Sequence, residues 1–259
     1  MAAPGHDSLE GESDAENGTK FAFDAAGCRR RPRRSGRIGD VSQRIWLLMT
    51  KDEMFAAVTA QRLRLLDTVS DLTPAQWNTP SLCAGWRNRD VLGHLVSILD
   101  VPTRRFLTGS VRRGGFNAFA GELARHYGER EPSELMARYR ELASEQFAPP
   151  IVGPIAPLTD VYIHTRDIER SLGIESTLDR LALATVVAYA AGGKARGFVP
   201  GKRVSGLRFE APDVNWTHGS GAVVSGSGEA IIMAVTGRRV ALDDLTGDGV
   251  GVLRMRLGD

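Results

Sequence analysis

The sequence has few cysteines and no excess of charge of either sign. It contains two cysteines in 259 residues, Cys28 and Cys83, which are too few for a disulfide framework or a cysteine-based zinc site. Its 33 basic and 31 acidic residues leave a net charge of +2, so the whole chain has no strong field to attract nucleic acid or an anionic membrane. This composition favours a protein of a reducing compartment that does not depend on nucleic acid or on a membrane.

Long apolar runs are also missing. No stretch after the N-terminal residues has the length of a signal-peptide core or of a membrane-spanning helix. The proportions of hydrophobic residues (42%) and charged residues (25%) are those of an ordinary globular protein. We therefore expect a cytoplasmic protein with no membrane partner.

Residues 1–48 differ from the rest of the chain in composition. Acidic residues predominate up to Asp24, and six arginines follow between Cys28 and Arg37, separated by proline and glycine. Such a composition cannot bury enough apolar surface to order the chain, so we predict a disordered or dispensable extension. The alternative interpretation of the arginine run is a tail that binds nucleic acid or a membrane surface.

Residues 49–195 show the spacing of amphipathic helices and no alternating strand pattern. Thr73 and Pro74 are typical of a helix start, Asn88 can cap another helix, and Pro102 is expected to kink that helix. The sequence predicts an antiparallel four-helix bundle. The expected helices are 51–69, 74–77, 88–107, 116–127, 133–147, 157–172 and 179–194.

Residues 202–259 follow a joint rich in glycine and proline and show a different pattern. Short alternating segments over 204–210, 214–217 and 222–224 predict strands, and 229–235 predicts a helix. Residues 249–257 fit either a strand or a helix. A small α+β domain of this size would be marginal alone, so we expect it to pack on the bundle and to form a cleft with it.

Three polar residues occupy positions where the helical period calls for apolar side chains. His94 shares a face with Val91 and Leu95, while Asp160 and His164 are four residues apart on one predicted helix. Side chains one helical turn apart can hold one metal ion, and a third ligand from a neighbouring helix would leave coordination positions open for water or substrate. This pattern indicates a catalytic divalent metal site.

The same residues also allow an interpretation without a metal. A single histidine on an apolar face can be a hydrogen-bonded core residue, and an aspartate with a histidine four positions later can be a simple helix pair. Spacing alone leaves both interpretations open.

Two motifs resemble the mycothiol-dependent maleylpyruvate isomerase family, a branch of the DinB-like metal-binding bundles. They are Pro80-Ser-Leu-Cys83-Ala-Gly-Trp86-Arg-Asn-Arg-Asp90-Val-Leu-Gly-His94-Leu95 and Asp160-Val-Tyr-Ile-His164-Thr-Arg-Asp167-Ile. The likeness continues to the C-terminus, through Asp213-Val-Asn-Trp216-Thr-His-Gly219 and the segment that ends at Gly237-Arg238. The resemblance implies a DinB-like bundle with a small C-terminal domain.

The resemblance also implies a site. In that family a divalent metal, typically zinc, is held by residues that correspond to His94, Asp160 and His164. The best-characterised members have glutamate at the position of Asp160, so the metal would sit closer to that helix here. An arginine of the second domain takes part in family catalysis, and Arg238 is the candidate in this chain.

A coordinated thiol loses its proton at neutral pH and becomes a nucleophile. Cys28 lies in the predicted extension and Cys83 in a loop where packing is expected, so an external thiol is the economical choice. The resemblance implies mycothiol as this thiol. We therefore expect a cis–trans isomerase or thiol S-transferase acting on a small electrophilic or cis-unsaturated substrate. The alternative is a non-catalytic metal-binding, ligand-binding or regulatory module.

Overall fold

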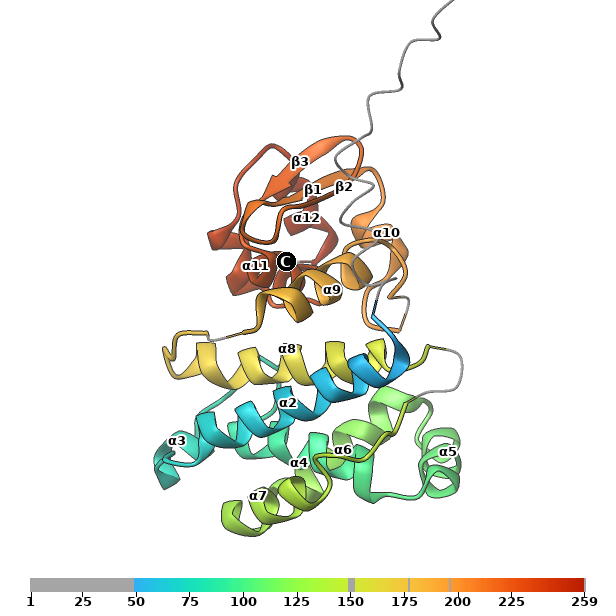
Figure 1. Cartoon of the computed structure of the whole chain (residues 1–259), viewed down its shortest axis with the longest axis vertical. Helices are drawn as coiled ribbons and strands as arrows, with labels where there is room; N and C mark the ends of the chain where they lie inside the picture. The colour runs from blue at the N-terminus through green and yellow to red at the C-terminus, as the bar shows by residue number, and fades with distance from the viewer. Residues whose placement is uncertain (1–48, 149–151, 177, 196, 259) are drawn as a thin grey trace, which may run out of the picture. The chain divides into compact units, whose positions relative to one another are not determined.

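The computed structural model describes residues 49–148, 152–176, 178–195 and 197–258, which belong to one compact unit. The predicted extension, including Cys28 and the arginine run, lies outside the described residues. The described part of the chain is mostly helical and has one small three-stranded sheet, as the sequence predicts (Figure 1). The domain boundaries at 48, 195 and 202 stay predictions.

The first two helices begin where the sequence predicts them. Helix α2 (Lys51–Val69) starts with a capping box in which the Thr50 side chain accepts from the Glu53 N–H and Glu53 accepts from the Thr50 N–H. Helix α3 (Pro74–Asn78) starts with the same arrangement of Thr73 and Gln76. These reciprocal hydrogen bonds satisfy backbone donors that the first turn of a helix otherwise leaves without partners.

Helix α4 (Asn88–Asp100) corrects two predictions about its ends. Asn88 is not the cap: it is buried and donates to the Gln76 carbonyl, while Asp90 accepts from the Arg87 N–H at 2.8 Å. Pro102 does not kink a continuous helix but separates α4 from α5 (Thr103–Arg112). Val101 is extended before this proline, because the proline ring disfavours a helical conformation of the residue preceding it.

Four further helices complete the helical part, with ends that differ from the predicted ones by a few residues. The C-terminal limits of α7 and α9 come earlier than predicted, and α8 starts earlier. The helices are α6 (Phe116–Gly128), α7 (Pro132–Glu141), α8 (Ile155–Ser171) and α9 (Arg180–Ala190). Helix α2 runs beside α8, and α4 packs against both α6 and α8 (Figure 1).

The close approach of α4 and α6 depends on glycine. A Cβ atom on Gly93 would lie 2.7 Å from both the Ala124 carbonyl oxygen and the Gly128 backbone nitrogen. A Cβ atom on Gly128 would lie 2.1 Å from a carboxylate oxygen of Asp90. These glycines let the two backbones come together and fix the height and rotation of α4, which carries His94.

The C-terminal part is built around a sheet with strand order β2-β1-β3. Strand β1 pairs antiparallel with β2, through Phe209 and His218, and parallel with β3, through Phe209 and Val224. The predicted strand at 204–210 begins later, because Val204 ends a short helix, and the ambiguous segment 249–257 is helical. The elements are α10 (Gly201–Val204), β1 (Leu207–Ala211), η1 (Pro212–Val214), β2 (Trp216–Gly219), β3 (Ala222–Ser225), α11 (Gly228–Val235), η2 (Arg239–Asp244) and α12 (Gly249–Arg256).

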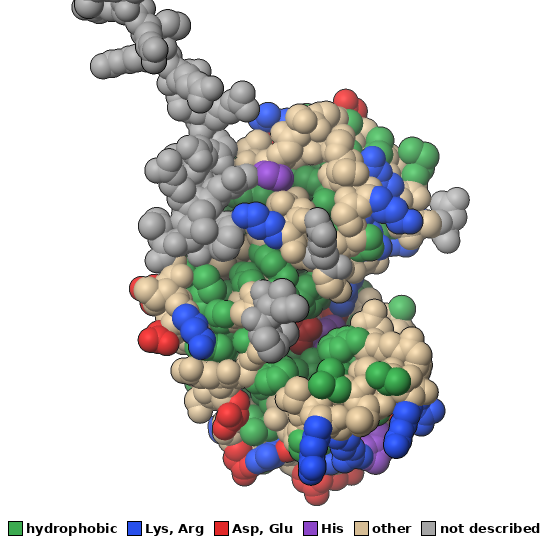
Figure 2. Space-filling view, turned by 90° about the vertical axis from the view of Figure 1, so that its right-hand side faces the viewer, with side chains coloured by type: hydrophobic (Ala, Val, Ile, Leu, Met, Phe, Trp, Pro, Cys, Tyr) green, Lys and Arg blue, Asp and Glu red, His purple; other side chains and the backbone are tan. Residues whose placement is uncertain are grey.

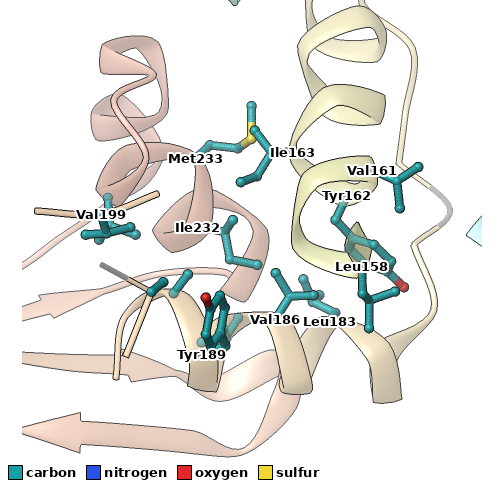
Figure 3. Packing of buried hydrophobic residues seen from close by; sticks show 14 of the residues in the cluster. Leu158, Val161, Tyr162, Ile163, Leu183, Val186, Tyr189, Val199, Ile232 and Met233 are labelled. Carbon is teal, nitrogen blue, oxygen red and sulfur yellow. The ribbon is translucent and has the colours of Figure 1, made fainter. Parts of the chain in front are cut away.

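Helices α8, α9 and α11 share one apolar core. Figure 3 shows Ile163 of α8 beside Met233 of α11, with Ile232 facing Val186 and Leu183 of α9, and all five side chains are buried. Burying large aliphatic side chains of this kind contributes about 1.5–3 kcal/mol each to folding.

Ion pairs surround this core. Glu229 of α11 accepts from Arg166 and Arg170 of α8 at 2.6–3.0 Å. The C-terminal part is therefore joined to α8 by both apolar packing and charge. No helix in the described ranges is long and apolar enough to cross a membrane.

Candidate metal centre

The structure brings together the three residues that the sequence predicts as metal ligands. His94 projects from α4, and Asp160 and His164 project from successive turns of α8. His94 Nε2 lies 3.7 Å from Asp160 Oδ2, and His164 Nε2 lies 3.6 Å from Asp160 Oδ1. The two imidazole rings are 4.8 Å apart at their centroids. Three donor atoms therefore face one point between two helices.

These spacings suit a small divalent cation. The donor atoms of the three residues all lie within 4.8 Å of one another. Around a tetrahedral zinc ion with bonds of about 2.0–2.2 Å, neighbouring donors are about 3.3–3.6 Å apart. The 3.6 and 3.7 Å separations, which involve different oxygens of Asp160, are longer than ordinary hydrogen bonds and slightly longer than those edges. Aspartate at position 160 therefore reaches far enough to act as a ligand.

Burial and neighbouring side chains place His94 and Asp160 in the protonation states that a ligand needs. Burial lowers the pKa of His94, so its imidazole is neutral near pH 7. Burial opposes ionisation of Asp160, but the neighbouring side chains of His164, His94 and Arg238 outweigh it and lower the pKa of its carboxyl. Neutral imidazole and carboxylate are the forms that bind metal ions.

One side of the site is formed by an indole ring. Trp86 lies on the loop between α3 and α4, where Ser81 donates from its backbone and from its hydroxyl to the Trp86 carbonyl. The indole lies 5.0 Å from the His94 ring and 5.9 Å from the His164 ring. Sequence analysis assigned Trp86 no partner, and the structure places it against both predicted ligands.

Trp86 also lines a groove of about 360 Å³ with Arg87, Arg125 and Glu129 among its walls. A second groove of about 340 Å³ is lined by Arg170 of α8 and by Val240 and Asp244 of η2. Figure 2 shows acidic and histidine side chains recessed near the middle of one face of the molecule.

Asp167 belongs to this cluster, although the sequence assigned it no role. Its carboxylate accepts from His164 Nδ1 at 2.9 Å and is fully buried. The candidate catalytic residue Arg238 also contacts Asp167, with Nε at 2.8 Å and Nη2 at 2.5 Å. Arg238 thus lies behind His164 instead of among the three ligands. The available signal was the spacing of His164 and Asp167 by three residues, which is one turn of a helix.

Cys83 is the second residue whose position the sequence did not indicate. Its thiol, His164 and Asp167 form another group whose donor atoms lie within 4.8 Å of one another. Burial and the neighbouring Asp167 raise the pKa of the thiol to about 11, so it is protonated near pH 7. Arg238 already supplies a cation to Asp167, which makes this second group less suited to a metal ion than the group around Asp160.

Comparison with known proteins supports the resemblance deduced from the motifs. Residues 58–148 match the family described as the mycothiol maleylpyruvate isomerase N-terminal domain. The matched segment includes Trp86 and His94. No curated protein sequence matches the chain at a significant level.

Solved structures extend the likeness in fold beyond this segment. A mycothiol-dependent maleylpyruvate isomerase superposes with a TM-score of 0.55 at 15% sequence identity, covering 78% of this chain and 95% of that protein. A mutant of a mycothiol-dependent maleylpyruvate isomerase gives a TM-score of 0.54 at 14% identity, with the same coverage. The predicted fold class, a helical bundle followed by a small α+β part, is thereby confirmed.

Proposed function

We propose that this chain is a metal-dependent and mycothiol-dependent enzyme, either a cis–trans isomerase similar to maleylpyruvate isomerase or a thiol S-transferase. The main support is the convergence of His94, Asp160 and His164 within the fold of mycothiol-dependent maleylpyruvate isomerase. The proposed ligands would hold one divalent ion, zinc by preference, since two imidazoles and a carboxylate are common zinc donors.

A bound divalent ion would lower the pKa of a coordinated thiol and so provide a thiolate near pH 7. Three protein donors leave at least one coordination position for that thiol. The Trp86 ring against both histidines restricts their rotation and shields them from water. We assign Arg238 to the reaction because it is linked to His164 through Asp167.

The reactive thiol in this proposal comes from a small molecule. Cys83 is held protonated, and a thiol in that state is a weak nucleophile. Mycothiol would supply the thiolate, and an electrophile or a cis-unsaturated acid would be the substrate. We place the reaction in the cytoplasm, where low-molecular-weight thiols stay reduced.

Metal analysis and turnover together test this function. We expect the purified full chain to carry a stoichiometric divalent ion and to convert cis-unsaturated diacids or common electrophiles only with mycothiol. His94→Ala and Asp160→Ala should lose both metal and turnover. His126→Ala, which changes an exposed histidine of α6, is the matched control and should keep both.

Two contrary results would each change a different part of this proposal. A protein without bound metal, whose properties do not change in His94→Ala, would support the non-catalytic binding or regulatory module instead. Turnover with other thiols but not with mycothiol would remove the proposed cofactor while keeping the metal site.

A further inference from the structure

The two histidines of the candidate metal centre have different surroundings at Nδ1. His164 Nδ1 lies 2.9 Å from Asp167 Oδ2, whereas His94 Nδ1 is buried and has no hydrogen-bond partner among the described residues. A neutral imidazole carries one N–H, and a carboxylate can only accept a hydrogen bond. Nδ1 of His164 therefore donates to Asp167, and Nε2 is the ring nitrogen on the side of Asp160, 3.6 Å from its Oδ1.

Asp167 is itself held on its other side. Arg238 Nε donates to Oδ1 at 2.8 Å and Arg238 Nη2 donates to Oδ2 at 2.5 Å, a bidentate arrangement in which the guanidinium plane matches the carboxylate. Because Asp167 is fully buried, its orientation is set by these two partners instead of by water.

Arg238 has little freedom to turn away from Asp167. Its Nη1 donates to the Thr236 carbonyl at 3.0 Å, and its backbone N–H donates to the Met233 carbonyl at 2.9 Å. Gly237, with φ at +110°, makes the turn that brings Arg238 back after α11. The Arg238 side chain is only 13% exposed, so most of the guanidinium faces protein.

We propose that Asp167 is a positioning residue for the ligand His164, and that Arg238 acts by holding Asp167 instead of by contacting the substrate. This chain of contacts lets a residue of the C-terminal part set the orientation of a ligand on α8. The inference rests on the proposed metal site. The inference gives Asp167 and Arg238 roles in holding His164 that neither the motifs nor the likeness in fold assigns.

Metal affinity is the main test. We expect Asp167→Asn to weaken zinc binding to the full chain by about 10- to 100-fold, the range typical for loss of a partner that orients a ligand. Arg238→Met should also weaken zinc binding, and Arg238→Lys should restore part of the lost affinity. In the double variant Asp167→Asn/Arg238→Met, affinity should fall no further than in Asp167→Asn alone, because both changes break one chain of contacts.

Two variants with similar chemistry serve as controls. Glu229→Gln removes a carboxylate of α11 that pairs with Arg166 and Arg170 of α8 but does not contact a proposed ligand. Arg203→Met removes a neighbouring arginine that donates to the Val235 carbonyl. Both controls should bind zinc with unchanged affinity, even where they lower thermal stability.

A spectroscopic measurement separates positioning from general destabilisation. Cobalt(II) in place of zinc reports ligand geometry through its visible absorption, so Asp167→Asn and Arg238→Met should shift that spectrum while Glu229→Gln and Arg203→Met should not. Nitrogen NMR of the metal-free wild-type protein should show His164 protonated at Nδ1. If Asp167→Asn does not fold, Arg238→Met and Arg238→Lys provide the same comparison.

Each contrary result has a distinct meaning. Unchanged zinc affinity and an unchanged cobalt spectrum in Asp167→Asn would overturn the positioning role. If Arg238→Met bound metal normally but lost turnover, Arg238 would act on the substrate and the second half of the proposal would be wrong. If His94→Ala and Asp160→Ala also bound metal like the wild type, the proposed metal site itself would fail.

Discussion

The indole of Trp86 is stacked on the imidazole of His164, with ring centroids 5.9 Å apart and planes inclined by 24°. This contact links the loop before α4 to a proposed ligand on α8. The same indole lies 5.0 Å from the His94 ring, so one aromatic side chain contacts both histidines. Its environment must change when an ion binds between them.

Trp86 should therefore report metal binding by fluorescence. Neighbouring imidazole groups quench indole emission to an extent that depends on their protonation and ligation, so zinc titration should change the emission of the wild-type protein. The change should be absent in Trp86→Phe, which keeps an aromatic ring and leaves Trp46, Trp77 and Trp216 as background. An equal change in Trp86→Phe would show that the metal binds elsewhere.

Asp160 should be the better carboxylate for this particular backbone. Its oxygens already lie 3.6 and 3.7 Å from the two Nε2 atoms, so the extra methylene of Asp160→Glu would push the carboxylate into the space of the ion. We expect Asp160→Glu to bind zinc more weakly than the wild type and more tightly than Asp160→Ala. Isothermal titration of the three proteins checks this order, and tighter binding by Asp160→Glu would contradict it.

The contact between α4 and α6 predicts a stability difference between two glycines. Gly93→Ala should lower the free energy of unfolding by about 1–3 kcal/mol, because the new methyl group would meet backbone atoms at 2.7 Å. Gly251→Ala is the control: it lies in α12 with open space around it, and it should stabilise the protein by about 0.5–1 kcal/mol. Denaturant unfolding measures both, and a neutral Gly93→Ala would contradict the close approach.

Glu229 should make stability depend on pH. Burial opposes its ionisation, but hydrogen bonds and charges from Arg170 and Arg166 outweigh burial and lower the pKa of the carboxyl in the folded protein. A depressed folded pKa stabilises the protein above the pKa of the unfolded chain, about 4.3, and this stabilisation is lost as pH falls through the folded value.

Glu229→Gln should accordingly be less stable than the wild type by about 2 kcal/mol at pH 7. The difference should narrow as the pH falls below the unfolded pKa of about 4.3 and through the lower pKa of the folded protein. Thermal unfolding from pH 7 to pH 3 measures the trend. The exposed Glu175→Gln should show little difference at any pH, and a constant gap for Glu229→Gln would argue against the ion pairs.

Local patterns predicted much of the fold because they depend on neighbouring residues. The helix start at Thr73 and the apolar spacing of α2 and α8 are properties of short segments. The ends of α4 were harder to predict. Asn88 has a side chain suited to capping a helix, but it is buried and donates to the Gln76 carbonyl. The capping position is held by Arg87, whose backbone N–H donates to the carboxylate of Asp90.

The cluster of the three proposed metal ligands could be predicted, but the groups behind them could not. His94, Asp160 and His164 stood out because polar side chains interrupted an apolar face. For Asp167 the only local signal was its spacing of three residues from His164, and its other partner, Arg238, lies 71 positions further along the chain. Cys83 was similar: the hydrogen bond from the Leu82 N–H to the Asp167 carbonyl docks its loop, and no local pattern indicates that contact.

The link between Asp167 and Arg238 also bears on the order in which the protein matures during synthesis. The two residues are 71 positions apart, so the ribosome releases all three proposed ligands before it has made Arg238. A nascent chain folds its earlier segments first. The proposed centre would then reach its final geometry only when the last quarter of the protein has been translated and folded, and chains that terminate early would carry a loosely held His164.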